Sequence, residues 1–367
     1  PCVSDPPATG PTIPAMPADR NSSTPPSAPT PAPAAVTVPI PPPVHVDRVM
    51  VEQRARDLAT RSIKTTAKAR GLRLAMSMVD LTTLEGRDSP EKVRALCRRA
   101  MHPCAVPVAE PVPPVAAVCV YPNLVATAVG TLGDSPVRIA AVATGFPSGQ
   151  YPLEIRLEDV AAAIDAGADE IDMVINRNAM LRGDLETVAA EIAAVRRVCL
   201  DRVAPPRPGA AATPPPRGGT HLKIILETGE LETYDLVRRA SDLAIAAATA
   251  GPLGAEDAWA DGCVFIKTST GKVSPAATMP VTLVMLEAIR DHYLRTGRRV
   301  GMKPAGGIRT AKDALRYLVL VKETLGDAWL SPHLFRFGAS SLADDLVRQV
   351  LRQERGGYAA AYDVSET

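Results

Sequence analysis

The sequence predicts an α/β protein: a (β/α)8 TIM barrel with an extra N-terminal helix and a disordered, proline-rich N-terminus. Eight apolar runs, most of them rich in β-branched residues, alternate with helical patterns between residues 71 and 356. Strands that alternate with helices form a parallel sheet covered by helices, and eight such units fit a closed barrel. A doubly wound open sheet is the alternative, but the GxGxxG motif that usually follows its first strand is absent.

The first helix is expected over residues 48–70, because Asp47 is a suitable N-cap and apolar residues recur at helical spacing. Strands are then expected at the apolar runs, which cover residues 74–81, 115–121, 137–144, 170–175, 222–227, 263–267, 300–303 and 334–338. Amphipathic helical patterns between them cover residues 156–166, 185–199, 231–250, 281–296 and 311–325.

Three segments are expected to lie outside the packed barrel of residues 47–356. Residues 1–46 are rich in proline and alanine, with 15 of the 36 prolines in the first 45 positions, and such a segment cannot bury enough apolar surface to fold. Residues 203–219 hold six prolines and read as a disordered insertion on the bottom face of the barrel, away from the usual chemistry. Residues 357–367 read as a flexible tail.

Composition narrows the class of function. A net charge of +1 and only 4% aromatic residues argue against a nucleic-acid partner, and no apolar run is long enough to cross a membrane. Six cysteines without a CxxC pair indicate a reducing compartment, and we expect a cytoplasmic protein. The five histidines show no metal-ligand spacing, so neither a metal nor another cofactor is expected. A homo-oligomer is compatible with the sequence.

Two lysines, Lys267 and Lys303, each end an apolar strand and open a glycine-containing turn. A buried lysine is costly unless it is neutral or paired, and a neutral lysine condenses with carbonyls. On neighbouring strands, two ammonium groups about 4 Å apart repel by roughly 4 kcal/mol at an effective dielectric near 20. This repulsion would lower one pKa by about three units. The alternative is that each lysine forms a salt bridge with a neighbouring carboxylate, Asp172 or Glu227.

Asp172 lies in an apolar strand between Ile171 and Met173. A buried carboxylate needs a cationic partner, so Asp172 either holds the barrel together or shuttles a proton beside the amine, and the two roles are compatible.

Two further turns are suited to phosphate. Gly306-Gly307 and Gly338-Ala339-Ser340-Ser341 follow the last two strands, where backbone N–H groups and a helix N-terminus commonly bind phosphate. Ser340 could instead be a plain N-cap.

Together these motifs resemble deoxyribose-phosphate aldolase, a class I (Schiff-base) aldolase family. The longer eukaryotic-type members are the most similar, given residues 143–150 and 174–177. The matching stretches occur in order and cover residues 79–84, 118–122, 170–174, 226–231, 265–272, 303–309 and 337–342.

The resemblance implies a TIM barrel and a role for each matched residue. Lys267 would form the imine, Lys303 would perturb it, and Asp172 would transfer protons with an ordered water. The implied substrate-binding residues are Asp80, Thr82, Thr270 and Lys272. The implied phosphate-binding residues are Gly271, Gly306, Gly307, Gly338, Ser340 and Ser341. Some members use a C-terminal tyrosine for proton transfer; Tyr358 and Tyr362 are candidates, but neither is terminal.

The function implied is the reversible cleavage of 2-deoxy-D-ribose 5-phosphate to acetaldehyde and D-glyceraldehyde 3-phosphate, with no metal. Its partners would be a small sugar phosphate and an aldehyde. Another Schiff-base aldolase acting on a different sugar phosphate is one alternative, since a barrel alone does not fix the substrate. A non-catalytic phosphate-binding barrel is the other, although it predicts the loss of Lys267 or Asp172, and both are present.

Overall fold

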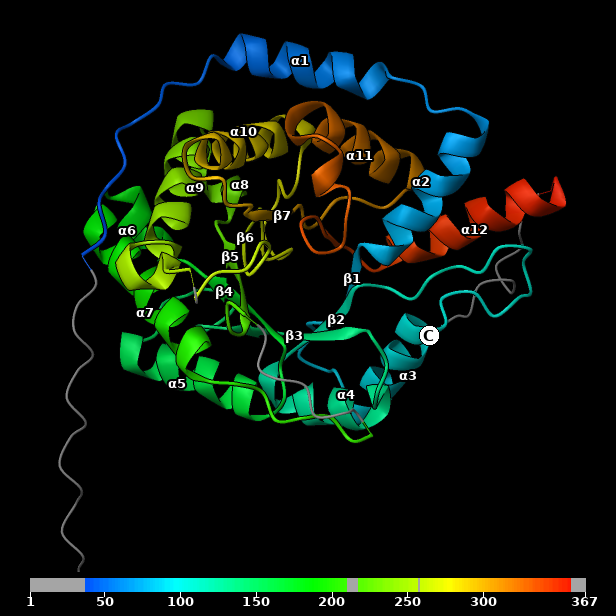
Figure 1. The fold of residues 1–367 in the computed structure, drawn as a ribbon, viewed down its shortest axis with the longest axis horizontal. Coiled ribbons are helices and arrows are strands. Elements are labelled where there is room, and N and C mark those ends of the chain that lie inside the picture. Colours follow the sequence, from blue (N-terminus) through cyan, green and yellow to red (C-terminus); the bar gives the residue numbers. More distant parts are fainter. Residues whose placement is uncertain (1–36, 210–216, 257, 358–367) are drawn as a thin grey trace, which may run out of the picture. The chain divides into compact units, whose positions relative to one another are not determined.

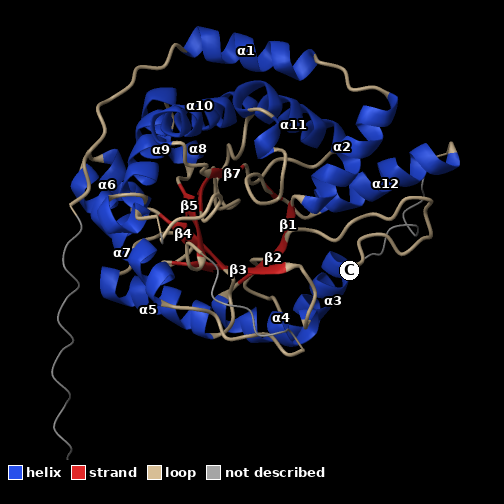
Figure 2. Cartoon of the chain, viewed as in Figure 1, coloured by secondary structure: helices blue, strands red, loops and turns tan. Residues whose placement is uncertain are grey.

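The computed structural model describes residues 37–209, 217–256 and 258–357, and these residues form a TIM barrel (Figures 1 and 2). Eight parallel strands follow one another in chain order around the sheet, from β1 to β7, and β8 pairs with β1. Two parallel bridges, Met302 with Phe335 and Ala305 with Gly338, close the circle between β7 and β8. The strands are β1 (Val79–Thr82), β2 (Ala117–Val120), β3 (Arg138–Ala143), β4 (Glu170–Val174), β5 (His221–Ile225), β6 (Val264–Lys267), β7 (Gly301–Lys303) and β8 (Phe337–Gly338).

Helices surround the sheet, as the right-handed β-α-β connection requires (Figure 2). They are α1 (Arg48–Thr60), α2 (Thr65–Ser77), α3 (Pro90–Met101), α4 (Val125–Leu132), α5 (Leu153–Asp165), α6 (Arg177–Leu181), α7 (Leu185–Asp201), α8 (Thr228–Leu231), α9 (Tyr234–Ala248), α10 (Met279–Thr296), α11 (Ala311–Leu325) and α12 (Ser341–Arg355). Short 3₁₀ helices occur at Pro122–Leu124, Gly251–Gly254 and Asp327–Trp329. No helix among the described residues combines the length and apolar character needed to cross a bilayer.

Most of the expected elements differ from the observed ones by up to about three residues at their boundaries, and two of them differ by more. The helix expected over 48–70 is two helices, α1 and α2, separated at residues 61–64. Asp47 does cap α1, since its side chain accepts a hydrogen bond from the Met50 N–H. The strand expected over 74–81 begins only at Val79, because α2 continues to Ser77. Alternation of large apolar and other residues near 74–78 fits either element, and packing of the α2 face decides for the helix.

The N-terminal arm runs along the outside of the barrel. Helix α1 packs on α10 and α11 (Figure 1), and Arg54 of α1 pairs with Glu287 of α10 at 2.6 Å. Residues 37–46 are placed by α9, where the Val46 N–H donates to Asp235 at 2.7 Å and Arg239 donates to the Pro41 carbonyl. The rest of the proline-rich segment, residues 1–36, lies outside the described residues.

The proline-rich connection over 203–219 lies at the N-terminal end of the strands. Arg207 donates to the Val137 carbonyl, just before β3, at 2.8 Å and pairs with Asp169, just before β4. The described residues of this segment therefore lie at the end of the barrel opposite the carboxyl ends of the strands. Residues 210–216 lie outside the described part.

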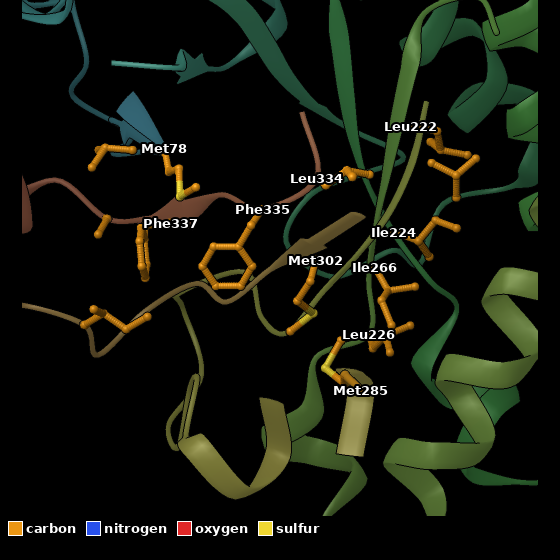
Figure 3. Packing of buried hydrophobic residues seen from close by; sticks show 14 of the residues in the cluster. Met78, Leu222, Ile224, Leu226, Ile266, Met285, Met302, Leu334, Phe335 and Phe337 are labelled. Carbon is orange, nitrogen blue, oxygen red and sulfur yellow. The ribbon is translucent and has the colours of Figure 1, made fainter. Parts of the chain in front are cut away.

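Alternation along the strands separates an apolar layer from a charged interior. Leu222 and Ile224 of β5, Ile266 of β6 and Met302 of β7 pack outward, in the same hydrophobic cluster as Met285 of α10 (Figure 3). Because successive side chains of a strand point to opposite faces, the residues between them point into the barrel. Those residues include Lys223, Lys267 and Lys303, and all three are buried.

Candidate active site

The two lysines predicted from their strand ends lie side by side. Lys267 of β6 and Lys303 of β7 are register partners. Both amines donate to the same carboxylate oxygen, Asp172 Oδ2, at 2.7 Å from Lys267 and 2.8 Å from Lys303. The alternative, in which each lysine forms a salt bridge with Asp172 or Glu227, is therefore confirmed for Asp172, which both lysines contact. Glu227 instead accepts hydrogen bonds from the backbone and hydroxyl of Thr270, at 3.1 and 2.5 Å.

Three further charged side chains complete this interior, and the pattern analysis of the sequence missed them. Lys223 of β5 pairs with Asp172 Oδ1 at 2.9 Å and with Glu170 at 2.5 Å. Arg336, which precedes β8, pairs with Glu170 at 2.9 Å and with Asp80 at 2.7 Å. The signal was present in each case, because each of these residues is a charge inside an apolar run, as Lys267 is.

Burial and neighbouring charges shift the pKa values of the two lysines in opposite directions. Burial lowers the pKa of Lys267, and the charge of Lys303 lowers it further, against the opposing attraction of Asp172. Burial also disfavours the charged form of Lys303, but Asp172 and Asp80 together raise the pKa of Lys303 well above its ordinary range. Lys267 is therefore the amine that reaches the neutral form more easily. This difference agrees in direction with the repulsion argument, although burial is the larger cause.

Asp172 stays ionised in this setting. Burial alone would raise the pKa of its carboxyl, but Lys223, Lys267 and Lys303 hold that pKa well below its ordinary value. An ionised carboxylate can accept a proton or orient a water, and it cannot donate a proton at neutral pH.

A cavity of about 500 Å³ opens at the carboxyl ends of the strands. Lys267 lies at its floor and is 3% exposed, whereas Lys303 and Asp172 lie behind the wall and are fully buried. The expected residues that line the cavity are Thr82, Lys267, Thr270, Gly271, Lys272, Gly306, Gly307, Gly338, Ser340 and Ser341.

Asp80 is the expected substrate-binding residue that does not line this cavity. Its two carboxylate oxygens lie 2.6 Å from the Lys303 amine and 2.7 Å from Arg336, and the side chain is fully buried. Asp80 therefore acts on Lys303, and its position does not support direct contact with a substrate hydroxyl.

The turns expected to bind phosphate meet at one side of the cavity. Gly306 has a φ of 79°, and a Cβ there would lie 2.7 Å from that of Ala276. A Cβ at Gly338 would lie 2.6 Å from that of Ala305. Both positions therefore require glycine, because a Cβ at Gly306 would clash with the loop after β6 and a Cβ at Gly338 would clash with the turn after β7.

Ser340 occupies the N-cap position of α12 without capping it. Its hydroxyl donates to the Thr82 carbonyl at 2.5 Å and accepts from the Thr82 N–H at 3.2 Å. The first turn of α12, which has no side-chain cap, thus begins at the cavity, where a helix N-terminus favours an anion.

Cations surround the same rim. Lys272 pairs with Glu85 at 2.8 Å, and Lys92 pairs with Asp88 at 2.6 Å. Arg309 also lines the cavity, and within the described residues no carboxylate lies within ion-pair distance of it. Arg309 is a further residue that the sequence analysis did not identify as a candidate, although it ends the motif 303–309.

The remaining predictions concern groups that the structure does not contain or describe. Tyr358 and Tyr362 lie outside the described residues, so their role stays a prediction. In the described part of the chain, no group of three or more His, Cys, Asp or Glu side chains is arranged to hold a metal ion.

Comparison with known proteins places the chain in a family. A family model described as DeoC/LacD family aldolase matches residues 74–203. The deoxyribose-phosphate aldolase of Mus musculus is 43% identical over 330 residues, which cover 88% of this chain and 94% of the relative. An identity of this size over nearly the whole of a relative shows that the chain belongs to the deoxyribose-phosphate aldolase family, a family of lyases.

Solved structures share the barrel. A protein from Toxoplasma gondii ME49, 20% identical, matches with a TM-score of 0.60 and covers 78% of this chain and 96% of its own. The deoxyribose phosphate aldolase of Aeropyrum pernix, described as having a unique tetrameric structure, is 22% identical with a TM-score of 0.50; that match covers 82% of this chain and 97% of the other. At these identities the likeness shows the fold, and it confirms the predicted TIM barrel.

Proposed function

We propose that the protein cleaves 2-deoxy-D-ribose 5-phosphate reversibly to acetaldehyde and D-glyceraldehyde 3-phosphate through a Schiff base on Lys267. One observation carries the proposal: Lys267 is the lysine that both reaches the cavity and has a pKa lowered by burial and a neighbouring cation. Membership of the aldolase family supports the same reaction.

The chemistry begins with the neutral amine of Lys267. It adds to the aldehyde carbon of the open-chain sugar, and the carbinolamine loses water to give a protonated imine. The C3 hydroxyl then gives up its proton, C3 becomes the carbonyl of glyceraldehyde 3-phosphate, and the electron pair of the C2–C3 bond moves to C2 to form an enamine. Protonation of C2 and hydrolysis of the imine release acetaldehyde and restore the lysine.

Asp172 and Lys303 support the proton transfers. Asp172 Oδ2 lies 2.7 Å from the Lys267 nitrogen, so it is close to the positive charge that develops on the imine. As an ionised carboxylate it can hold the water that takes the C3 hydroxyl proton, and Lys303 stays protonated and keeps that carboxylate charged.

Replacing Lys303 tests this division of labour. Lys303→Leu removes the cation next to Lys267, so the pKa of Lys267 should rise, by about one to three units. The neutral amine is the reactive form, so the acid limb of kcat/KM against pH should move to higher pH by the same amount. At neutral pH the rate should then fall by about 10- to 1000-fold.

The control for this change is Lys303→Arg, which keeps the charge and should leave the acid limb within a few tenths of a pH unit of its original position. An acid limb that does not move in Lys303→Leu would contradict the repulsion between the two lysines.

The phosphate is proposed to bind between the turns that follow β7 and β8. Gly307 and the α12 N-terminus would supply backbone N–H groups. Gly271, Gly306 and Gly338 would let the backbone approach the anion, because their own N–H groups already donate to Ser269, Gly338 and Pro304. Ser340 would supply its backbone N–H, since its hydroxyl already donates to the Thr82 carbonyl. Ser341 would supply its N–H and hydroxyl, while Arg309 and Lys272 would supply charge. Lys272 would exchange its partner Glu85 for the phosphate. Thr82 and Thr270, nearer to Lys267, would contact the sugar.

A change at Ser340 tests this position. Ser340→Asp places a negative charge against the phosphate, so KM for deoxyribose 5-phosphate should rise strongly. The slow reaction of unphosphorylated deoxyribose should be spared, because phosphate is remote from the bond that breaks. The measurement is kcat/KM for deoxyribose 5-phosphate divided by kcat/KM for deoxyribose. We expect this ratio to fall by about 100-fold.

Ser340→Asn is the matched control, because it has the same shape as the aspartate and disturbs the contact with Thr82 equally. A ratio that falls as far in Ser340→Asn as in Ser340→Asp would place the phosphate elsewhere.

We also propose the partners, the cellular compartment and the assembly of the protein. The partners are a small sugar phosphate and an aldehyde, without nucleic acid or membrane, in the cytoplasm. Assembly into a homo-oligomer is proposed because the Aeropyrum pernix relative is tetrameric. Sedimentation of the purified protein tests the assembly.

A further inference from the structure

The buried charges behind the cavity form a closed ring. Starting at Lys223, each charge contacts the next, of opposite sign, and the sixth returns to the first. The members of this charge ring are Lys223, Glu170, Arg336, Asp80, Lys303 and Asp172, and the distances between successive members are 2.5, 2.9, 2.7, 2.6, 2.8 and 2.9 Å.

The charge ring balances itself. It holds three carboxylates and three cations, and all six side chains are nearly or fully buried, Arg336 being the most exposed at 2%. Buried charges are tolerated when each is paired, and every member of the charge ring has two partners of opposite sign. Lys267 stands outside this balance, because its one ring contact is Asp172 Oδ2, which Lys303 already contacts.

Other titratable groups near the ring change this balance little. The Cys119 thiol lies 3.9 Å from Asp172 Oδ2, and burial raises its pKa to about 11, so it is neutral. His221 lies 3.7 Å from Glu170, and burial lowers its pKa to about 3, so it is neutral as well.

Two charged groups lie at the ends of the barrel. Arg138 approaches Glu170 to 3.7 Å from the end away from the cavity, and it is 31% exposed, so water screens it. Glu227, at the cavity end, is bound by Thr270 and lies 3.5 Å from Arg177.

We propose that Arg336 and Glu170, which do not line the cavity, are positioning residues that complete the charge ring and thereby leave Lys267 as the unmatched lysine that reacts with the aldehyde. The inference rests on the proposed role of Lys267. It follows from charge balance: with Lys267 neutral the buried interior has no net charge, and with Lys267 protonated it carries one surplus positive charge. Loss of a proton from Lys267 is therefore favoured over loss from Lys303.

Charge balance predicts opposite effects for the two positioning residues. Arg336→Met leaves the ring one negative charge in excess, which favours a protonated Lys267. Glu170→Gln leaves one positive charge in excess, which favours a neutral Lys267. The double variant Arg336→Met/Glu170→Gln removes one charge of each sign and restores the balance, and Arg336→Lys keeps it.

The experiment measures the reactivity of Lys267 without any substrate. The full-length protein is labelled with a trace of acetic anhydride at a series of pH values, and labelling at Lys267 is mapped by mass spectrometry. The pH of half-maximal labelling should rise by about one unit in Arg336→Met and fall by about one unit in Glu170→Gln. In the double variant and in Arg336→Lys it should stay within a few tenths of a unit of the unchanged protein.

The acid limb of kcat/KM should move in the same directions. If Arg336 and Glu170 had a purely structural role, the two single variants would not shift the acid limb or the labelling midpoint in opposite directions. Labelling midpoints that stay in place, or that move the same way in both single variants, overturn the inference. If Arg336→Met does not fold, Glu170→Gln decides alone, and a midpoint that does not fall overturns the inference.

The labelling also separates this inference from the proposed reaction. Opposite shifts in a protein that does not cleave deoxyribose 5-phosphate would keep the charge ring and reject the substrate. Unmoved midpoints in a protein that cleaves it would keep the reaction and reject the charge ring.

Discussion

Borohydride reduction in the presence of acetaldehyde is expected to attach a two-carbon group to Lys267 and to no other lysine. The reagent traps the protonated imine, and an imine forms where a neutral amine meets the cavity. Lys303 does not line the cavity, and its pKa is raised by Asp172 and Asp80 despite burial. Lys272 and Lys92 line the cavity, but each is paired with a carboxylate near solvent. Mass mapping of the reduced protein identifies the modified lysine.

Loss of the same lysine should have the largest effect on turnover. Lys267→Met keeps the length and apolar body of the side chain, and kcat should fall by about 10⁴-fold or more, because the covalent route is lost. The charge ring keeps its own balance without Lys267, so Lys267→Met should unfold at a temperature close to that of the unchanged protein. Lys272→Met is the control, and it should still be trapped at Lys267. A stable adduct at Lys272 or Lys303 in the unchanged protein would overturn the assignment.

Replacement of Asp172 by Asn should separate imine formation from turnover. Without the carboxylate, Lys267 loses its one anionic contact among the described residues, so its pKa should fall and trapping should persist to lower pH. Turnover should nevertheless fall by about 10²- to 10⁴-fold, because the group that holds the proton-accepting water is gone. Asp172→Asn should therefore extend trapping to lower pH and at the same time lower kcat.

Stability should fall in the same variant. Removing one partner of a buried ion pair costs about 3–5 kcal/mol, and Asp172 is the partner of Lys223, Lys267 and Lys303. Urea unfolding measures this loss. Asp80→Asn is the matched control, because it makes the same change in the charge ring without touching Lys267, so its trapping should extend less far toward low pH. Turnover that stays within a few-fold in Asp172→Asn would exclude Asp172 from the chemistry.

Much of the fold follows from sequence pattern. All eight strands were expected, because a parallel strand buried on both faces is a continuous apolar run. The helix α11 was expected with the bounds that it has, residues 311–325. The break between α1 and α2 was not, since Arg61-Ser62-Ile63-Lys64 contains neither proline nor glycine. Helix α1 ends where Arg61 adopts a non-helical ψ of 127°, after Thr60, whose hydroxyl donates to the Asp57 carbonyl.

The site was predictable at the strand ends and less so in the interior. Lys267, Lys303 and Asp172 were identified because each interrupts or ends an apolar run. Lys223 and Arg336 carry the same signal, but their roles depend on which charges meet across the barrel. That information lies in the register of strands far apart in the sequence, and only the closed barrel brings Arg336 to Glu170, 166 residues away.

The connection between α7 and β5 is a suitable place for attaching the protein to a solid support. Arg207 ties it to the Val137 carbonyl and to Asp169, at the end of the barrel opposite the cavity. Loops of this kind tolerate inserted sequence well, because they lie outside the packed core. A surface-coupling residue placed at Gly209 or Arg217, both of which are exposed, would fix the molecule to a support by the end of the barrel opposite the cavity. The cavity would then face the passing solution, which is the orientation that an immobilised aldolase needs.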